Sequence, residues 1–203
     1  MVDGERCVHS MIEQGSCRAC VESCPTGAWV IDDEQVGIRT SRCDGCGLCV
    51  AACPQDAIAL EQNIPLRTWN GHTLALAACE RCNTSVPEGA TVTCVNALGL
   101  TQLLAHYHQG CRHLFLLTGD CHRCDRGSRP GADLDKAVTT LNRILRSRGL
   151  PRLVLKFSNV SVWKRVYYKS RDNLEASPAV NRRGFFRQAL VEAVRQNQKL
   201  RNL

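Results

Sequence analysis

Several features that would assign a function class are missing from this sequence. No run of apolar residues approaches the roughly 18 that a membrane-spanning helix needs. Aromatic residues make up only 5% of the chain, and too few lie near arginine clusters in residues 1–150 to form a stacking platform for nucleic acid. A phosphate-binding loop, a dinucleotide-binding glycine motif, a Ser/His/Asp set and carboxylates paired for acid–base catalysis are also missing. We therefore expect no transmembrane segment and no nucleic-acid binding, and the sequence shows no substrate chemistry.

The N-terminus also lacks the apolar core of a signal peptide, since residues 1–6 are mostly polar. Cysteine, in contrast, is abundant, with 14 among 203 residues. A secreted disulfide scaffold is the obvious alternative for such a chain. However, C-x2-C pairs suit metal binding in a reducing compartment better than they suit disulfides. We therefore expect a cytoplasmic protein whose cysteines bind metal.

The most informative stretch runs from Cys43 to Pro54 with the spacing C-x2-C-x2-C-x3-C-P. Three closely spaced thiolates of such a run bind one [4Fe–4S] cubane, and the fourth binds a neighbouring cubane. Gly45 and Gly47 let the backbone turn sharply beside the cluster, and Pro54 redirects the chain after the last cysteine. A zinc knuckle is the alternative, but it uses paired C-x2-C units rather than this run. The spacing predicts an iron–sulfur site.

A second copy of the pattern precedes the first, with Cys17-x2-Cys20-x3-Cys24-Pro25 matching Cys46-x2-Cys49-x3-Cys53-Pro54. Between the copies, residues 29–31 and 36–38 flank an acidic turn and predict a short hairpin. Over residues 7–60 the sequence resembles the bacterial ferredoxin family with two [4Fe–4S] clusters. That resemblance implies an α+β module of two ligand loops related by a pseudo-twofold axis, each followed by a short helix and strand.

One position departs from that family, because Gln14 stands where the first copy should carry its leading cysteine. The nearest candidate is Cys7, separated from Cys17 by nine residues. Either residues 8–16 form an inserted loop and Cys7 completes the cluster, or the cluster has three irons and Cys7 is a spare thiol. Ligation is favoured, because the only other nearby sulfur is the thioether of Met11. By the crossed pattern of the family, the resemblance implies two ligand sets, Cys7, Cys17, Cys20 and Cys53, and Cys24, Cys43, Cys46 and Cys49.

Residues 63–73, which include Pro65 and Gly71, are predicted as a linker, and beyond them strands alternate with helices. Short apolar runs predict strands at residues 74–78, 91–94, 113–117 and 153–157. One helix is predicted between Cys94 and Gly110, and another begins at Asp133, with Leu134, Val138, Leu141 and Leu145 on one face. This alternation predicts a small α/β domain with a parallel sheet over residues 74–158.

Five cysteines of this domain fall at or just after predicted carboxyl ends of strands, where open α/β sheets place their sites. They are Cys79, Cys82, Cys94, Cys121 and Cys124. The two C-x2-C pairs satisfy the rule for a structural zinc, and they satisfy a third iron–sulfur centre, [2Fe–2S] or [4Fe–4S], equally well. Cys111 stands apart and is predicted to be a buried or free thiol.

The order of these motifs, ending in Gly119-Asp120-Cys121-His122, resembles the delta subunit of methyl-viologen-reducing hydrogenase over residues 74–157. The resemblance implies a [2Fe–2S] cluster and electron transfer to partners of the heterodisulfide-reductase type. It departs at Leu116, where that family has a further cysteine, and Cys124 is present downstream instead. The ligand set and the cluster type therefore stay open between iron–sulfur and zinc.

Charge is unevenly distributed along the chain. Residues 1–62 contain 4 Lys/Arg against 10 Asp/Glu, net −6, and residues 63–203 contain the other 22 against 9, net +13. Residues 159–203 are predicted as a basic tail with a helix from Gln188 to Leu200. Arg182-Arg183 resembles a twin-arginine export signal, but it is internal and no apolar segment follows. Three readings of this tail stay open, a solvated helix, a docking surface for an acidic partner and a peripheral membrane contact.

We expect an iron–sulfur electron-transfer protein with a ferredoxin-like two-cluster module (1–62), a linker (63–73), a cysteine-rich α/β domain (74–158) and a basic tail (159–203). Such a protein is more in keeping with a non-catalytic subunit than with an enzyme. It would relay single electrons between an acceptor and a hydrogenase, a formate dehydrogenase or a heterodisulfide-reductase-like partner. The alternative is a zinc-stabilised interaction or maturation protein that carries a ferredoxin module.

Overall fold

The computed structural model describes residues 2–12, 14–32, 36–62, 64–82, 84–87, 89–127 and 132–172. The chain divides into two compact units, Met1–Asn173 and Leu174–Leu203. All described residues belong to the first unit, which contains both the ferredoxin module and the α/β domain. The predicted helix at residues 188–200 and the Arg182-Arg183 pair lie outside the described residues.

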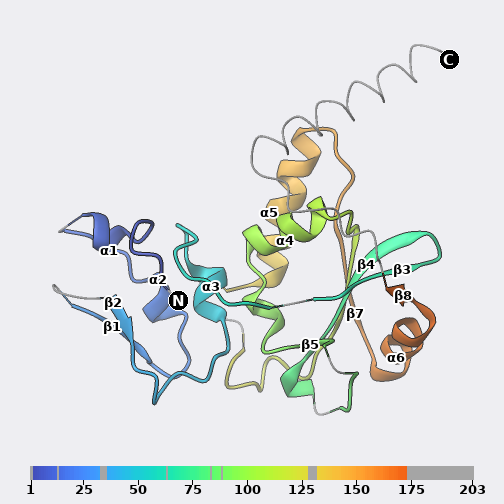
Figure 1. Ribbon diagram of the computed structural model, residues 1–203, viewed down its shortest axis with the longest axis horizontal. Helices are drawn as coiled ribbons and strands as arrows, with labels where there is room; N and C mark the ends of the chain where they lie inside the picture. Colours follow the sequence, from blue (N-terminus) through green and yellow to red (C-terminus); the bar gives the residue numbers. More distant parts are fainter. Residues whose placement is uncertain are drawn as a thin grey trace. The chain divides into compact units, whose positions relative to one another are not determined.

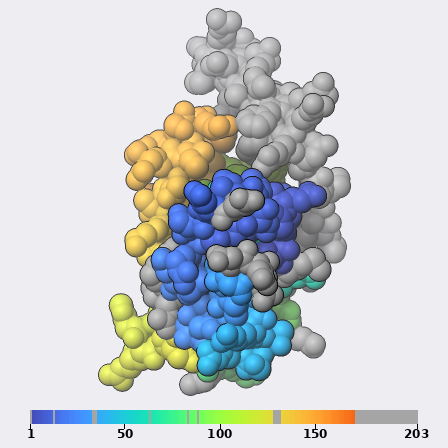
Figure 2. All heavy atoms as spheres, turned by 90° about the vertical axis from the view of Figure 1, so that its left-hand side faces the viewer, coloured from blue at the N-terminus to red at the C-terminus, as the bar shows by residue number. Residues whose placement is uncertain are grey.

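The ferredoxin module consists of short elements set around the cysteine loops (Figure 1, blue). They are α1 Val8–Met11, α2 Ala19–Glu22, β1 Trp29–Ile31, β2 Val36–Ile38 and α3 Leu48–Ala52. Strands β1 and β2 pair antiparallel with Trp29 opposite Ile38, which confirms the predicted hairpin. Trp29, Val50 and Ile58 form a small apolar core that also contacts several cysteines. Figure 2 shows the face on which the N-terminal residues, in dark blue, lie against the lighter blue residues that follow them.

The α/β domain is built on one mixed sheet with the strand order β7-β6-β4-β3-β8, and β5 pairs with β4. Its strands are β3 Leu66–Trp69, β4 His72–Cys79, β5 Thr91–Val92, β6 His113–Leu117, β7 Val154–Ser158 and β8 Arg171–Asp172. β4, β5, β6 and β7 run parallel, whereas β3 pairs antiparallel with β4 and with β8. The predicted parallel sheet is confirmed, with β3 added antiparallel to β4 at one side and β8 beyond it, running in the same direction as β4.

Helices cover both faces of this sheet (Figure 1). They are α4 Leu100–His108, α5 Leu134–Ser147 and α6 Val160–Lys169, and two single turns, η1 Glu80–Cys82 and η2 Val95–Ala97, follow β4 and β5. In β4, Ala75 and Ala77 pack with residues of α4 and α5, whereas Leu76 packs with Trp163 of α6. Because both faces of β4 are buried, its sequence reads as a continuous apolar run rather than an alternating one.

Helix α5 forms as its sequence predicts. The carboxylate of Asp133 accepts a hydrogen bond from the N–H of Lys136 and so caps the first turn. The apolar side chains at positions 134, 138, 141 and 145 are all buried. Local capping and 3.6-residue periodicity are therefore enough to specify this helix.

The structure differs from the prediction at both ends of the α/β domain. The segment predicted as a linker contains β3, which turns at Asn70-Gly71 into β4; both turn residues have positive φ, 49° and 76°. An Asn-Gly pair is a strong hairpin signal, and the linker prediction overlooked it. The segment predicted as the start of the tail forms α6, whose Trp163 is fully buried against the sheet. Residues 160–169 thus belong to the domain.

The ferredoxin module packs directly on the α/β domain. Leu48 and Ala52 of α3 share a buried apolar cluster with Cys94 and Ala97 of the α/β domain. A side chain at Gly99 would place its Cβ 2.9 Å from the Cα of Ala51, so glycine permits this close approach. The two cysteine-rich regions therefore meet at a closely packed interface.

Candidate metal centres

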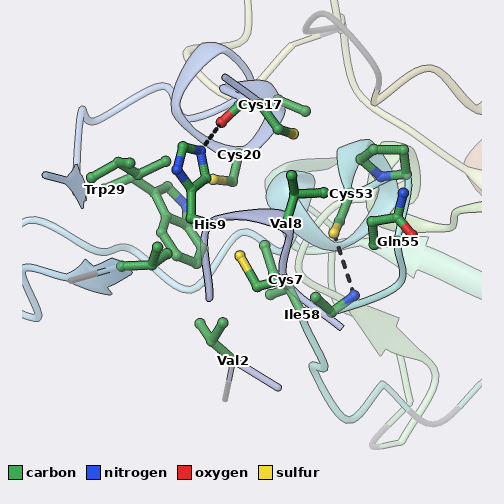
Figure 3. Close-up of a pocket in the computed structure, with 15 residues that line it drawn as sticks. Val2, Cys7, Val8, His9, Cys17, Cys20, Trp29, Cys53, Gln55 and Ile58 are labelled. Carbon is green, nitrogen blue, oxygen red and sulfur yellow. Dashed lines mark hydrogen bonds between the residues drawn. The ribbon is translucent and has the colours of Figure 1, made fainter. Parts of the chain in front are cut away.

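One pocket brings together the four cysteines predicted to hold the first cluster. Cys7, Cys17, Cys20 and Cys53 all line it, together with apolar residues such as Trp29 and Ile58. Figure 3 shows these four sulfur-bearing side chains around the same hollow. Because Cys53 belongs to the second copy of the motif, the pocket has the crossed arrangement that the ferredoxin resemblance implies. The four thiols fit the donor set of an iron–sulfur cubane.

Contacts of the N-terminal segment bring Cys7 to this pocket. The Asp3 N–H donates to the Ala57 carbonyl at 2.7 Å, and Val2 forms a β-bridge with Ile58. Arg6 forms an ion pair with Asp56 at 3.4 Å. The segment before Cys7 is thereby tied to the segment after Cys53, and the short helix α1 follows directly after Cys7. This geometry supports the interpretation in which Cys7 completes the set.

The two copies of the motif also share their local geometry around the crossing cysteines. The Ala28 N–H donates to the Cys24 sulfur, and the Ala57 N–H donates to the Cys53 sulfur, each at 3.3 Å. The residue before each alanine has a positive φ, 61° at Gly27 and 53° at Asp56. Each copy therefore aims a backbone N–H at a sulfur four residues earlier.

Cys24, Cys43, Cys46 and Cys49 form the second group. Burial raises the pKa of Cys49, and the nearby charges of Cys24 and Cys43 raise it further. Burial raises the pKa of Cys46 to about 12, and Asp44 and Cys49 add to this shift. These thiols lie close enough for their thiolates to repel one another, so together they favour a bound cation.

The five cysteines of the α/β domain converge at one edge of its sheet. Cys79 ends β4, Cys94 follows β5, and Cys121 and Cys124 follow β6, and these strands run parallel. Burial raises the pKa of Cys94 to about 11, and Cys79, Cys121 and Cys124 contribute to the shift. The predicted convergence at the carboxyl ends of the strands therefore occurs in the structure, and Cys82 joins it through the turn η1.

Across the described residues, no three His, Cys, Asp or Glu side chains converge closely enough to hold a single metal ion. This includes the cysteines of the ferredoxin module, whose predicted ligand sets would surround a cubane rather than a single ion. Cys111 lies apart from all three groups; it is fully buried, and its thiol donates to the His113 carbonyl at 3.3 Å. Its prediction as a buried thiol is confirmed.

Two side chains that contact the cysteine loops are missing from the sequence-based prediction. The His9 ring hydrogen-bonds to the Cys17 carbonyl beside the first pocket (Figure 3). Arg126, only 5% exposed, forms an ion pair with Asp44 at 2.7 Å. Although burial opposes the charge on Asp44, its hydrogen bond from Arg126 holds the pKa of this carboxyl below its usual range. The partners are 82 residues apart, so no local pattern could reveal them.

Comparison with known proteins places this chain among iron–sulfur proteins over part of its length. Residues 15–58 match the family described as a 4Fe-4S dicluster domain. One subunit of the ion-translocating oxidoreductase complex of Methanosarcina acetivorans is 43% identical over 44 residues, 22% of this chain and 17% of that protein. The thiosulfate reductase electron transfer subunit PhsB of Salmonella typhi is 37% identical over 79 residues, 38% of this chain and 36% of that protein. No solved structure matches.

These comparisons show a 4Fe-4S dicluster domain at residues 15–58 and support an iron–sulfur electron-transfer function. The matched segments span well under half the length of either relative. Cys7 and the five α/β cysteines lie outside the matched domain. Within the described part of the chain, no helix is long and apolar enough to cross a membrane.

Proposed function

We propose that this chain is an electron-transfer subunit that holds two [4Fe–4S] clusters in its ferredoxin module and a third iron–sulfur centre in its α/β domain. The observation that carries this proposal is the pocket in which Cys7, Cys17, Cys20 and Cys53 meet. The last three of these cysteines lie within the residues that match a dicluster domain. When bound, such clusters exchange single electrons.

In this proposal the chain supplies one set of four thiolates to each cubane. Cys7, Cys17, Cys20 and Cys53 hold the first cluster, and Cys24, Cys43, Cys46 and Cys49 hold the second. The N–H groups of Ala28 and Ala57 donate to the sulfurs of Cys24 and Cys53. Hydrogen bonds to ligand sulfurs raise cluster potentials because they stabilise the added negative charge. Each crossing cysteine thus tunes the cluster it helps to hold.

The α/β domain supplies the ligands of the third centre from Cys79, Cys82, Cys94, Cys121 and Cys124. The resemblance of residues 74–157 to the hydrogenase delta subunit favours iron–sulfur over zinc at this position. Zinc binding by the two C-x2-C pairs is the competing proposal, and it would make this domain a structural module.

The positions of the cysteines support an order for the three centres. Cys20 of the first set lies near enough to Cys49 of the second for their charges to interact. Cys46 of the second set shares a buried cluster with Cys94 of the α/β domain. The second cluster would therefore lie between the first cluster and the third centre. Electrons that pass between those two would go through it.

The partners of such a relay are other redox proteins. The names of both relatives describe subunits of oxidoreductases, which supports a place in a multi-subunit complex with a donor such as a hydrogenase or formate dehydrogenase. The acidic residues 1–62 and the basic residues 63–203 give the chain two regions of opposite charge for docking. Peripheral membrane contact through the tail and a cytoplasmic location stay predictions.

Metal analysis of the anaerobically purified full chain tests this proposal. Two cubanes contribute about eight irons with matching sulfide, and a third cluster adds about two or four more. We expect that total, no zinc, and a brown colour that bleaches with dithionite. Eight irons with one zinc would show that the α/β cysteines bind zinc and hold no third iron–sulfur centre. A chain that binds no iron would contradict the electron-transfer function altogether.

A further inference from the structure

A single buried arginine joins the loop of the second cluster to the cysteine site of the α/β domain. The Nε of Arg126 donates to a carboxylate oxygen of Asp44 at 2.7 Å, and its Nη2 donates to the Asp44 carbonyl at 3.2 Å. Its Nη1 donates to the carboxylate of Glu80 and to the carbonyl of Thr93, both at 3.2 Å. The guanidinium therefore uses all three nitrogens to bind three separate segments of the chain.

Each partner of Arg126 is next to a proposed metal ligand. Asp44 lies between Cys43 and Cys46, and its carboxylate accepts a hydrogen bond from the Cys46 N–H at 3.2 Å. Glu80 follows Cys79, and Thr93 precedes Cys94. A movement of the arginine would therefore displace backbone that carries ligands of two centres.

Thr93 makes a second connection between the same two sites. Its hydroxyl donates to the Cys46 carbonyl at 3.2 Å and accepts from the side-chain amide of Gln62 at 3.1 Å. The Cys79 thiol approaches the Thr93 carbonyl at 3.8 Å. The segment before Cys94 is thus hydrogen-bonded both to the second-cluster loop and to Arg126.

Because Arg126 is buried, its positive charge should act on the nearby second cluster. A guanidinium that is 5% exposed is only weakly screened by water, and burying it is costly unless it is paired. A positive charge beside an iron–sulfur cluster favours the reduced form, which carries one more negative charge. A neutral replacement would remove that charge and would leave the carboxylates of Asp44 and Glu80 without their partner.

We propose that Arg126 is a positioning residue that locks the Cys43–Cys46 loop onto the α/β cysteine site and raises the reduction potential of the second cluster. This inference rests on the proposed function, since it needs a cluster at Cys24, Cys43, Cys46 and Cys49. It goes beyond that function in assigning control of one cluster to a residue of the other domain. The ferredoxin module and the α/β domain would then be one redox unit.

The test is a redox titration of the full chain, followed by EPR, for wild type, Arg126→Gln and Arg126→Lys. In Arg126→Gln we expect the equilibrium constant for one-electron reduction of the second cluster to fall on the order of tenfold. This corresponds to a reduction potential lower by about 59 mV. Arg126→Lys keeps the charge but cannot bridge all these partners at once. It should therefore stay near the wild-type potential while changing the magnetic interaction between the reduced second cluster and its neighbours.

Lys136→Gln is the control for net charge, because Lys136 is 86% exposed in its ion pair with Asp133. It should shift no potential. Asp44→Asn removes the negative charge of the same ion pair. It should therefore raise the reduction potential of the second cluster, a shift opposite in sign to that of Arg126→Gln. This variant also gives the answer if Arg126→Gln does not fold.

Equal potentials in wild type, Arg126→Gln and Asp44→Asn would overturn the inference, as would shifts of the same sign in both variants. Zinc at the α/β site would contradict the proposed third centre without affecting this test, because the potential of the second cluster is measured by itself. A wild-type chain without any reducible cluster would overturn the proposed function and the inference with it.

Discussion

The ferredoxin module and the α/β domain assemble their cysteines in different ways. In the ferredoxin module, two short runs of sequence and their turns supply seven of the eight proposed ligands, and only Cys7 comes from outside these runs. In the α/β domain, the five cysteines come from the ends of three parallel strands and the loops that follow them. The first kind of site depends on local spacing, whereas the second depends on a sheet that must already be formed.

The apolar core of the ferredoxin module is also much smaller than that of the α/β domain. Trp29, Val50 and Ile58 are the buried residues of the ferredoxin core. The α/β sheet is buried on both faces by large clusters that include Leu103, Leu141 and Trp163. A small core gives little stability without metal or other cross-links. Metal should therefore hold the ferredoxin module together, whereas the α/β domain provides a scaffold that does not need it.

Removal of metal should produce the largest difference between the two regions. We expect hydrogen exchange, followed by mass spectrometry, to show lost protection over residues 2–60 in the metal-free chain. The strands β4 and β6 should keep their protection, because their hydrogen bonds are covered by apolar side chains on both sides. Reconstitution with iron and sulfide is the control and should restore the first region. Equal loss of protection in β4 and β6 would mean that metal also stabilises the α/β fold.

Local features of the sequence predict much of this structure. The hairpin β1–β2, the capped helix α5 and the strands β4, β6 and β7 all follow from short-range pattern and turn chemistry. The four predicted α/β strands lie at the right positions, and from them the convergence of the five cysteines follows. Spacing alone also indicates the dicluster domain at residues 15–58.

The features that sequence patterns do not predict depend on contacts between distant residues. Sequence patterns assign helix α6 to the basic tail because its charged residues hide the apolar pattern of Trp163 and Val166. These two side chains are buried only once the sheet is in place. Arg126 resembles an ordinary surface arginine until Asp44, 82 residues earlier, lies beside it. The position of Cys7 depends on the bridge between Val2 and Ile58, for which the sequence carries no local signal.

A smaller and sharper effect is expected from Cys7→Ala, which tests the one ferredoxin ligand that lies outside the two runs. If Cys7 completes the first set, its loss should remove about one iron and leave a three-iron centre, with a new EPR signal in the oxidised protein. The second cluster should be unchanged, because Cys7 lines the pocket formed by the first set. Met11→Ala, a change in the same loop at a side chain 60% exposed, is the matched control. Two intact four-iron spectra in Cys7→Ala would show that this thiol is a spare one.

The smallest effect concerns Cys111, the one cysteine that the comparison of the two regions leaves without a metal. Burial raises the pKa of this thiol to about 11, and its side chain has no exposed surface. Only the thiolate reacts with alkylating agents, so at pH 8 very little of Cys111 is reactive, and its reactive fraction should rise about tenfold per pH unit up to that pKa. Alkylation of the native, metal-loaded chain with iodoacetamide, followed by peptide mass spectrometry, should therefore leave Cys111 unmodified at pH 8. Unfolding in urea should make it react fully. Rapid modification of Cys111 in the native chain would show that the core beneath α4 opens to solvent, and the α/β domain would then be less rigid than the scaffold described above.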